Sequence, residues 1–177
     1  MEYRMGVLVT SLATAVLMNT GCAMFGDQKA VGKPSDMFLA NTAQGSGAEV
    51  ALSRLALERS TNPEVKRFAQ KTIRDHEKLN QEITQIANRR GMTVSMEPDA
   101  TEDKISTHLS KLSGNEFDRE YMSEMIADHA KMTAKLDAQT KQTKDSELQQ
   151  WAARQLPLFQ EHLHTAQSIN QDLVAIR

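Results

Sequence analysis

Four ionisable side chains interrupt the apolar faces of the helices that the sequence predicts. Each predicted helix carries one of them at the centre of its apolar stripe, in the order Glu49, His76, His129 and His162. An ionisable group in an apolar interior has to be hydrogen-bonded, ion-paired or metal-bound, because burying it alone is strongly unfavourable. Imidazole nitrogens and a carboxylate oxygen are ligands for zinc, copper and iron. The four residues therefore predict a mononuclear transition-metal site in the core.

Such a site requires four helices that face one another, and apolar residues recur at helical spacing in four segments. We expect helices over about residues 36 to 59, 63 to 90, 114 to 140 and 145 to 176. A polar run before Pro63 and Glu64 is a typical helix start, and Ser113 with Glu116 predicts a capping box for the third helix. Pro157 falls inside the fourth helix.

The connection from Gly91 to Asn115 is long and contains a possible short helix over residues 101 to 112. In helical bundles a long connection allows the chain to cross over. Nothing in the sequence alternates with the period of a β-strand. The predicted fold is therefore all-α, a four-helix bundle with one long crossover connection between helices two and three.

The four candidate ligands can meet only if they lie at one height in the bundle. Counting from the predicted turns leaves Glu49 and His76 about 4.5 Å apart along the helix axes, and His76 and His129 closer still. Between helices three and four the match is poorer, since twelve residues separate His129 from Lys141 and seventeen separate Asp145 from His162. His162 is the ligand whose height fits least well.

Three further residues are predicted to orient the ligands, namely Asp75, Asp128 and Tyr121. Asp75 and Asp128 each precede a candidate histidine, and neighbouring residues on a helix point apart, so each is expected to serve a histidine of another helix. The alternative is a metal-free polar network, with Glu49 paired to an arginine or to Tyr121, inside a structural or interaction module of the cell envelope.

Other candidate groups give weaker signals. Glu161 and His164 have the Glu-x-x-His spacing of di-iron bundles but fall off the apolar stripe, and His108 lies in the long connection. Methionines beside His129 could favour copper, although methionines at helical spacing commonly fill cores. No nucleophile elbow, phosphate loop or Cys and His pair is present, so we expect no catalytic residues and lean against an enzyme.

The first residues have the composition of a targeting segment. Residues 1–21 combine Arg4 with an apolar run too short to span a bilayer, and the single cysteine, Cys22, follows it. We expect a signal peptide over 1–21, lipidation of Cys22, a flexible tether over 22–35 and a helical domain over 36–177. The expected location is the periplasmic side of the cell envelope, as an outer-membrane lipoprotein held by its lipid anchor. Cleavage after Ala23 by an ordinary signal peptidase is the alternative.

The composition fits one globular domain. The 177 residues include 21 basic and 23 acidic side chains, which are scattered and give a net charge of -2. This balance excludes a typical nucleic-acid-binding protein.

Three segments resemble the domain-of-unknown-function 4142 family of bacterial envelope proteins, which is grouped with ferritin-like bundles. They are AEVALSRLALERSTNPEVKRFAQKTIRDHEKLN, LSGNEFDREYMSEMIADHAKM and AARQLPLFQEHLHTAQ. The second is also similar to a family of periplasmic His- and Met-rich bundle proteins linked to copper. The resemblance implies a ferritin-like fold and an envelope location. Ferritin-type di-iron oxidation needs several inward carboxylates, whereas only Glu49 stands at the centre of a stripe, so storage, sensing or stabilisation is expected instead of turnover.

Overall fold

The computed structural model describes residues 32–175, and this part of the chain is all-helical. Helices cover 85% of it and no strand occurs within it, so the predicted all-α class is confirmed. Four helices are long: α1 (Pro34–Arg59), α2 (Pro63–Arg89), α4 (Gly114–Gln142) and α5 (Ser146–Ala175). The short helix α3 (Ala100–Leu109) lies in the connection between α2 and α4. The signal segment, Cys22 and Ala23 lie outside the described residues.

Proline residues define the starts of the first two helices. Pro34 occupies the first turn of α1, so that helix begins two residues earlier than predicted and takes in the end of the expected tether. At α2 the cap is Asn62, whose side-chain oxygen accepts hydrogen bonds from the backbone N–H groups of Glu64 and Val65 at 2.8 and 3.5 Å. Pro157 lies inside α5, as predicted.

The capping box predicted at the start of α4 is wrong. Ser113 occupies the cap position but its side chain makes no capping hydrogen bond. The next residue, Gly114, has a φ of 56°, in the left-handed region, so the backbone at this start departs from the geometry in which a cap hydroxyl meets the first helical N–H groups. A capping box forms instead at α3, between Asp99 and Glu102.

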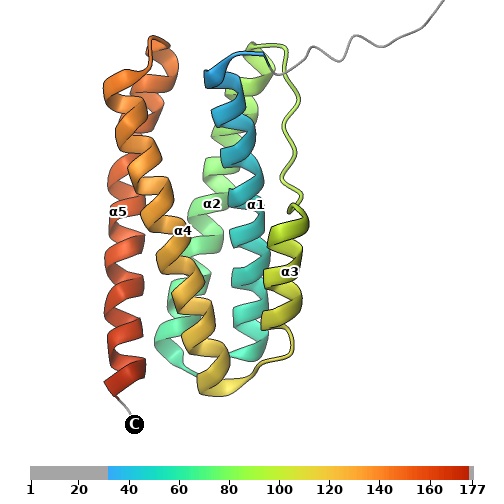
Figure 1. Cartoon of the computed structure of the whole chain (residues 1–177), viewed down its shortest axis with the longest axis vertical. Helices are drawn as coiled ribbons and strands as arrows, with labels where there is room; N and C mark the ends of the chain where they lie inside the picture. Colours follow the sequence, from blue (N-terminus) through green and yellow to red (C-terminus); the bar gives the residue numbers. More distant parts are fainter. Residues whose placement is uncertain (1–31, 176–177) are drawn as a thin grey trace, which may run out of the picture.

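The long helices pack as two pairs, α1 with α2 and α4 with α5. After α2 the chain returns along the outside of α1 to α3, which lies against both α1 and α4 (Figure 1). The close approach requires Gly47, because a Cβ atom there would lie 1.8 Å from the carbonyl oxygen of Met96. No helix among residues 32–175 is both long and apolar enough to cross a bilayer.

The core consists of two apolar clusters separated by a polar layer. One cluster is centred on Phe68, Phe117 and Tyr121, and the other on Leu79, Trp151 and Phe159. On each long helix the buried residues of the two clusters lie on either side of one buried ionisable residue. These four residues are Glu49, His76, His129 and His162.

Candidate metal centre

The structure brings the four predicted ligands together in the interior. Glu49 is 6% exposed, and the three histidines are at most 1% exposed. One nitrogen from each of His76, His129 and His162 lies within 4.8 Å of the other two. His162, whose height fitted least well in the sequence, is therefore part of the cluster.

The inward-facing atoms are in direct contact. Oε2 of Glu49 lies 3.3 Å from Nε2 of His76 and 3.4 Å from Nε2 of His129. The same His129 nitrogen lies 3.1 Å from Nδ1 of His162. Glu49 thus joins α1 to the imidazoles of α2 and α4, and His129 completes the link to α5.

A backbone hydrogen bond fixes the tautomer of His129. Its Nδ1 lies 2.9 Å from the carbonyl oxygen of Met125, one turn earlier in α4. A carbonyl only accepts hydrogen bonds, so Nδ1 carries the proton and Nε2 of the neutral ring has a free lone pair directed into the cluster.

Asp75 fixes His162 in the same manner. Oδ2 of Asp75 accepts from Nε2 of His162 at 2.8 Å, so Nδ1 of the neutral ring has a lone pair that faces His129. Lys71 holds the carboxylate with a hydrogen bond of 2.7 Å and lies 3.3 Å from the same imidazole nitrogen. As expected, Asp75 serves a histidine on another helix.

His76 contacts Ser46, a residue that the sequence reasoning missed. The hydroxyl of Ser46 lies 3.1 Å from Nδ1 of His76 and can accept a hydrogen bond from it. Nε2 of His76 and Oε2 of Glu49 are buried, and neither has a hydrogen-bond partner among the described residues. The lone pairs of His129 and His162, a third available from His76 and Oε2 of Glu49 in its ionised form therefore make up a set of possible metal donors. This donor set fits a transition-metal ion, which would relieve the repulsion between the lone pairs.

The electrostatics of the cluster favour neutral imidazoles. Burial lowers the pKa of His76 well below its usual value, and the neighbouring histidines add to that shift. Burial likewise lowers the pKa of His129 to about 4 and lowers that of His162, although Asp75 opposes the change there. Neutral imidazole is the form that binds metal, so no proton has to leave these rings at neutral pH.

The pKa of Glu49 shifts in the opposite direction. Burial raises the pKa of its carboxyl well above the usual range, and the carboxylates of Asp128 and Glu102 raise it further. Without a cation beside it, this group retains its proton to a higher pH than an exposed glutamate.

Of the three residues predicted to orient the imidazoles, only Asp75 contacts one. The hydroxyl of Tyr121 lies 2.9 Å from that of Ser53, and burial raises the pKa of Tyr121 above its usual value. Asp128 lines a cavity beside Glu49, and no hydrogen bond joins it to an imidazole among the described residues.

The remaining candidates lie elsewhere. His108 and His164 are exposed, and Glu161 is exposed beside Lys71. Asp118 is a second fully buried carboxyl, but it precedes His129 by eleven residues, or about 16 Å along α4.

The methionines considered for copper do not form a wall at the cluster. Met122 and Met125 pack in an apolar cluster, and Met132 lines the cavity.

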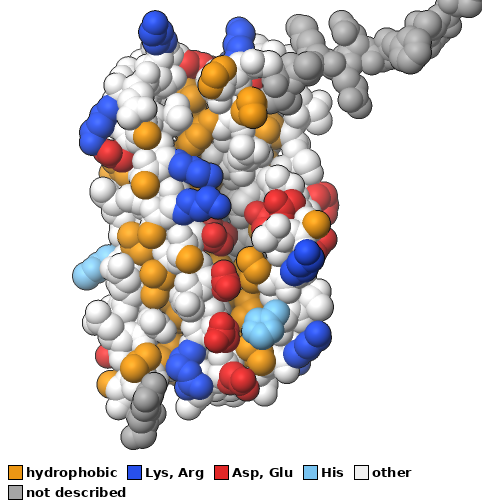
Figure 2. Space-filling model, in the orientation of Figure 1, with side chains coloured by type: hydrophobic (Ala, Val, Ile, Leu, Met, Phe, Trp, Pro, Cys, Tyr) orange, Lys and Arg blue, Asp and Glu red, His pale blue; other side chains and the backbone are white. Residues whose placement is uncertain are grey.

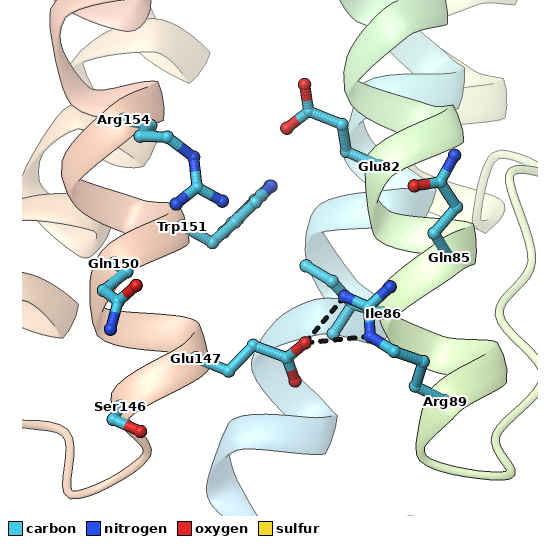
Figure 3. A pocket seen from close by; sticks show the side chains of 9 residues that line it. All are labelled: Glu82, Gln85, Ile86, Arg89, Ser146, Glu147, Gln150, Trp151 and Arg154. Atoms are coloured by element: carbon cyan, nitrogen blue, oxygen red, sulfur yellow. Dashed lines mark hydrogen bonds and ion pairs between the residues drawn. The ribbon is translucent and has the colours of Figure 1, made fainter.

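Two hollows in the structure differ in whether the predicted ligands line them. A cavity of about 280 Å³ between α1, α3 and α4 is lined by both Glu49 and His76. A separate cleft of about 410 Å³ lies between α2 and α5, where Arg89 and Glu147 pair across it (Figure 3). It contains none of the four predicted ligands. The cavity beside α3 therefore brings solvent next to two of the four predicted ligands.

Fold and site together define a class: an all-helical protein with three histidines and one glutamate clustered in its core. The sequence profile of the family described as Domain of unknown function (DUF4142) matches residues 21–169. The chain belongs to this family, so the predicted membership in the domain-of-unknown-function 4142 family is confirmed. No curated protein and no solved structure shows significant similarity to the chain.

Proposed function

We propose that the protein binds one transition-metal ion through His76, His129, His162 and Glu49. The observation that carries this proposal is the direction of the lone pairs. Outward hydrogen bonds to Met125 and Asp75 fix two of the rings so that their free nitrogens face inward, toward a carboxylate oxygen that has no partner. Three nitrogens and one oxygen suit zinc, copper or iron.

The proposed role is storage, sensing or stabilisation, without turnover. Among the described residues the cluster lacks the additional inward carboxylates on which di-iron oxidation depends. The cavity beside Glu49 gives a bound ion a route to solvent, which suits reversible binding.

Metal titration tests the proposal. Purified protein stripped with a chelator is expected to take up one equivalent of Co²⁺ or Zn²⁺ and to unfold at a higher temperature, because a ligand that binds only the folded state stabilises it. His129→Ala should abolish both effects, whereas His164→Ala, at an exposed position, should retain them.

Two results would contradict the metal site. If wild-type protein bound no metal, the residues would form a metal-free polar network in a structural or interaction module. If His129→Ala bound as tightly as wild type, the site would lie elsewhere. Elemental analysis of protein isolated from its native source would identify the physiological ion.

We further propose that the chain is a ferritin-like four-helix bundle with one long crossover, attached on the periplasmic side of the outer membrane through a lipid on Cys22. The apolar run before Cys22 and the resemblance to envelope proteins support this location. Cells fed labelled palmitate should incorporate label into the wild type and not into Cys22→Ala. Absence of label from the wild type would favour cleavage after Ala23.

A further inference from the structure

Four acidic residues form a row along one face of α4. Glu116, Glu120, Glu124 and Asp128 follow one another at intervals of four residues, which places their side chains one above the next. Figure 2 shows a row of acidic side chains over α4, beside α3. Like charges at this spacing destabilise a helix, so the row does not improve the stability of α4.

The acidic row becomes more buried toward the cluster. Glu116 and Glu120 are exposed, whereas Glu124 and Asp128 are half-buried. Burial raises the pKa of Glu124, and the charges of Asp128 and Glu120 raise it further. The carboxylates are therefore close enough to repel one another, and a cation beside them would relieve that repulsion.

At its inner end the row meets the cavity of about 280 Å³. Asp128 of α4 and Glu102 of α3 line this cavity together with Glu49 and His76. Since a water molecule occupies about 30 Å³, the cavity has room for a hydrated ion. Glu49 lines this cavity and is only 6% exposed, and its Oε2 has no hydrogen-bond partner in the part of the chain that the structure describes.

On the opposite side of the cluster, between α2 and α5, the carboxylates are already paired with a cation. The ammonium group of Lys71 lies 2.7 Å from Asp75, 3.4 Å from Glu161 and 3.3 Å from Nε2 of His162, so these carboxylates attract a metal ion less than unpaired ones would. The cavity also has two amines, Lys131 and Lys135, but both side chains are exposed and free to swing into solvent.

We propose that the acidic row of α4, with Glu102, is the route by which a divalent metal cation reaches the cluster, with Glu49 as the first of the four ligands to meet it. This inference rests on the proposed function and concerns the path of the ion. Carboxylates along a path raise the local concentration of cations and the rate of association, and salt weakens the effect.

Stopped-flow mixing of chelator-stripped protein with Co²⁺, followed by the visible absorption of the bound ion, tests the route. We expect the double variant Glu124→Gln/Asp128→Asn to bind on the order of tenfold more slowly at low salt. The dissociation rate should change much less. At 1 M salt, where the Debye length is about 3 Å, the two rates of association should converge.

The matched control, Glu77→Gln/Asp137→Asn, removes the same charge from side chains that are 48% and 45% exposed and lie outside the cavity, and it should associate nearly as fast as wild type. A third variant, Glu161→Gln, tests the Lys71 side. Equal rates for the route variant and the control, or slower binding by Glu161→Gln alone, would overturn the route while leaving the metal site intact. Failure of wild-type protein to develop any cobalt absorption would instead overturn the proposed function.

Discussion

At the scale of single residues, each imidazole of the cluster makes a hydrogen bond on the side that faces away from the others. The partners differ in kind: the Met125 carbonyl for His129, the Asp75 carboxylate for His162 and the Ser46 hydroxyl for His76. A carbonyl or carboxylate partner fixes both the tautomer and the orientation of an imidazole, whereas a hydroxyl, which can donate or accept, fixes its orientation alone. All three rings are therefore held in place before binding, and the tautomers of His129 and His162 are fixed.

Asp75→Asn should weaken metal binding by about 10- to 100-fold, the usual cost of losing a group that orients a ligand. The asparagine side chain can donate or accept toward Nε2 of His162, so it no longer fixes the tautomer. Isothermal titration with Zn²⁺ measures the change. Asp137→Asn, in an exposed Lys-Asp pair of the same i,i+4 spacing, is the control. Unchanged affinity in Asp75→Asn would show that the carboxylate has no part in the site.

Glu49→Gln should stabilise the metal-free protein at high pH. The folded-state pKa of Glu49 is raised, so its contribution to stability is complete below the unfolded-state value and decreases as the pH rises above about 4.3. Between the unfolded-state and folded-state pKa values, the free energy of unfolding of the wild type should fall, relative to that of Glu49→Gln, by up to about 1.4 kcal/mol per pH unit. Urea unfolding at pH 5 and pH 8 in the presence of a chelator measures this difference.

In the presence of metal the wild type should be more stable than Glu49→Gln, because the glutamine lacks the anionic oxygen ligand. If the gap between the two metal-free proteins did not widen from pH 5 to pH 8, Glu49 would titrate as an ordinary exposed carboxyl.

At the scale of elements, the segment between α2 and α4 depends on one glycine of α1. A Cβ atom at Gly47 would overlap the backbone of Met96, whereas at Gly45 its nearest neighbour would be Glu102 Oε1 at 3.8 Å, an ordinary contact. Gly47→Ala should therefore destabilise the protein by about 1 to 3 kcal/mol, as overpacking does. Gly45→Ala should stabilise it by up to about 1 kcal/mol through helix propensity.

Thermal unfolding of the two alanine variants checks these opposite signs. Limited proteolysis should also cut residues 91–99 faster in Gly47→Ala, since that segment has to move off α1. Equal stability of the two variants would mean that the segment is not held against the helix.

Apolar periodicity predicted the helices because it reports which face of a helix is buried. Asn62 and Pro63 marked one boundary through local chemistry. The relative heights of the four candidate ligands depended on where the helices begin and end, which periodicity does not determine. α4 ends at Gln142, thirteen residues after His129, and α5 begins at Ser146, sixteen residues before His162. The difference of three residues corresponds to about 4.5 Å along the helix axes, which side chains can span.

The sequence did not predict which side chains contact the candidate ligands from the far side of each ring. Ser46 and Lys71 act through contacts with His76 and His162, and those contacts depend on how each helix is rotated about its axis. The spacing of an apolar stripe constrains that rotation only coarsely. The four acids of α4, in contrast, could have been noticed from their spacing alone.

At the scale of the whole molecule, two of the polar links between the helix pairs α1–α2 and α4–α5 differ in kind. In the middle the cluster links Glu49 and His76 of one pair to His129 and His162 of the other. Near one end Arg90, which caps α2, hydrogen-bonds Asp36 of α1 and Asp145 just before α5. The first link would depend on metal and the second does not.

Arg90→Ala should therefore destabilise the protein whether or not metal is present, by about 2 kcal/mol, less than the cost of breaking a fully buried ion pair. Its guanidinium is 15% exposed and contacts the carboxylates of Asp36, Asp145 and Glu147, which would be left without it. Arg89→Ala is the control. The side chain of Arg89 is 58% exposed and, within residues 32–175, pairs with Glu147 alone (Figure 3), so its loss should cost less than about 1 kcal/mol.

The loss of stability in Arg90→Ala relative to wild type should also depend on pH. Although partial burial opposes the shift, hydrogen bonds from the Leu148 backbone and Arg90 lower the pKa of Asp145, and those from Arg89 and Arg90 lower that of Glu147. The stabilisation is therefore present above the unfolded-state pKa values near 4 and is lost as the pH falls through the lowered folded-state values. Urea unfolding at pH 7 should separate Arg90→Ala clearly from wild type, and the gap should narrow below pH about 3. A gap that stayed constant with pH would assign the loss to packing of the arginine stem instead of to its charge.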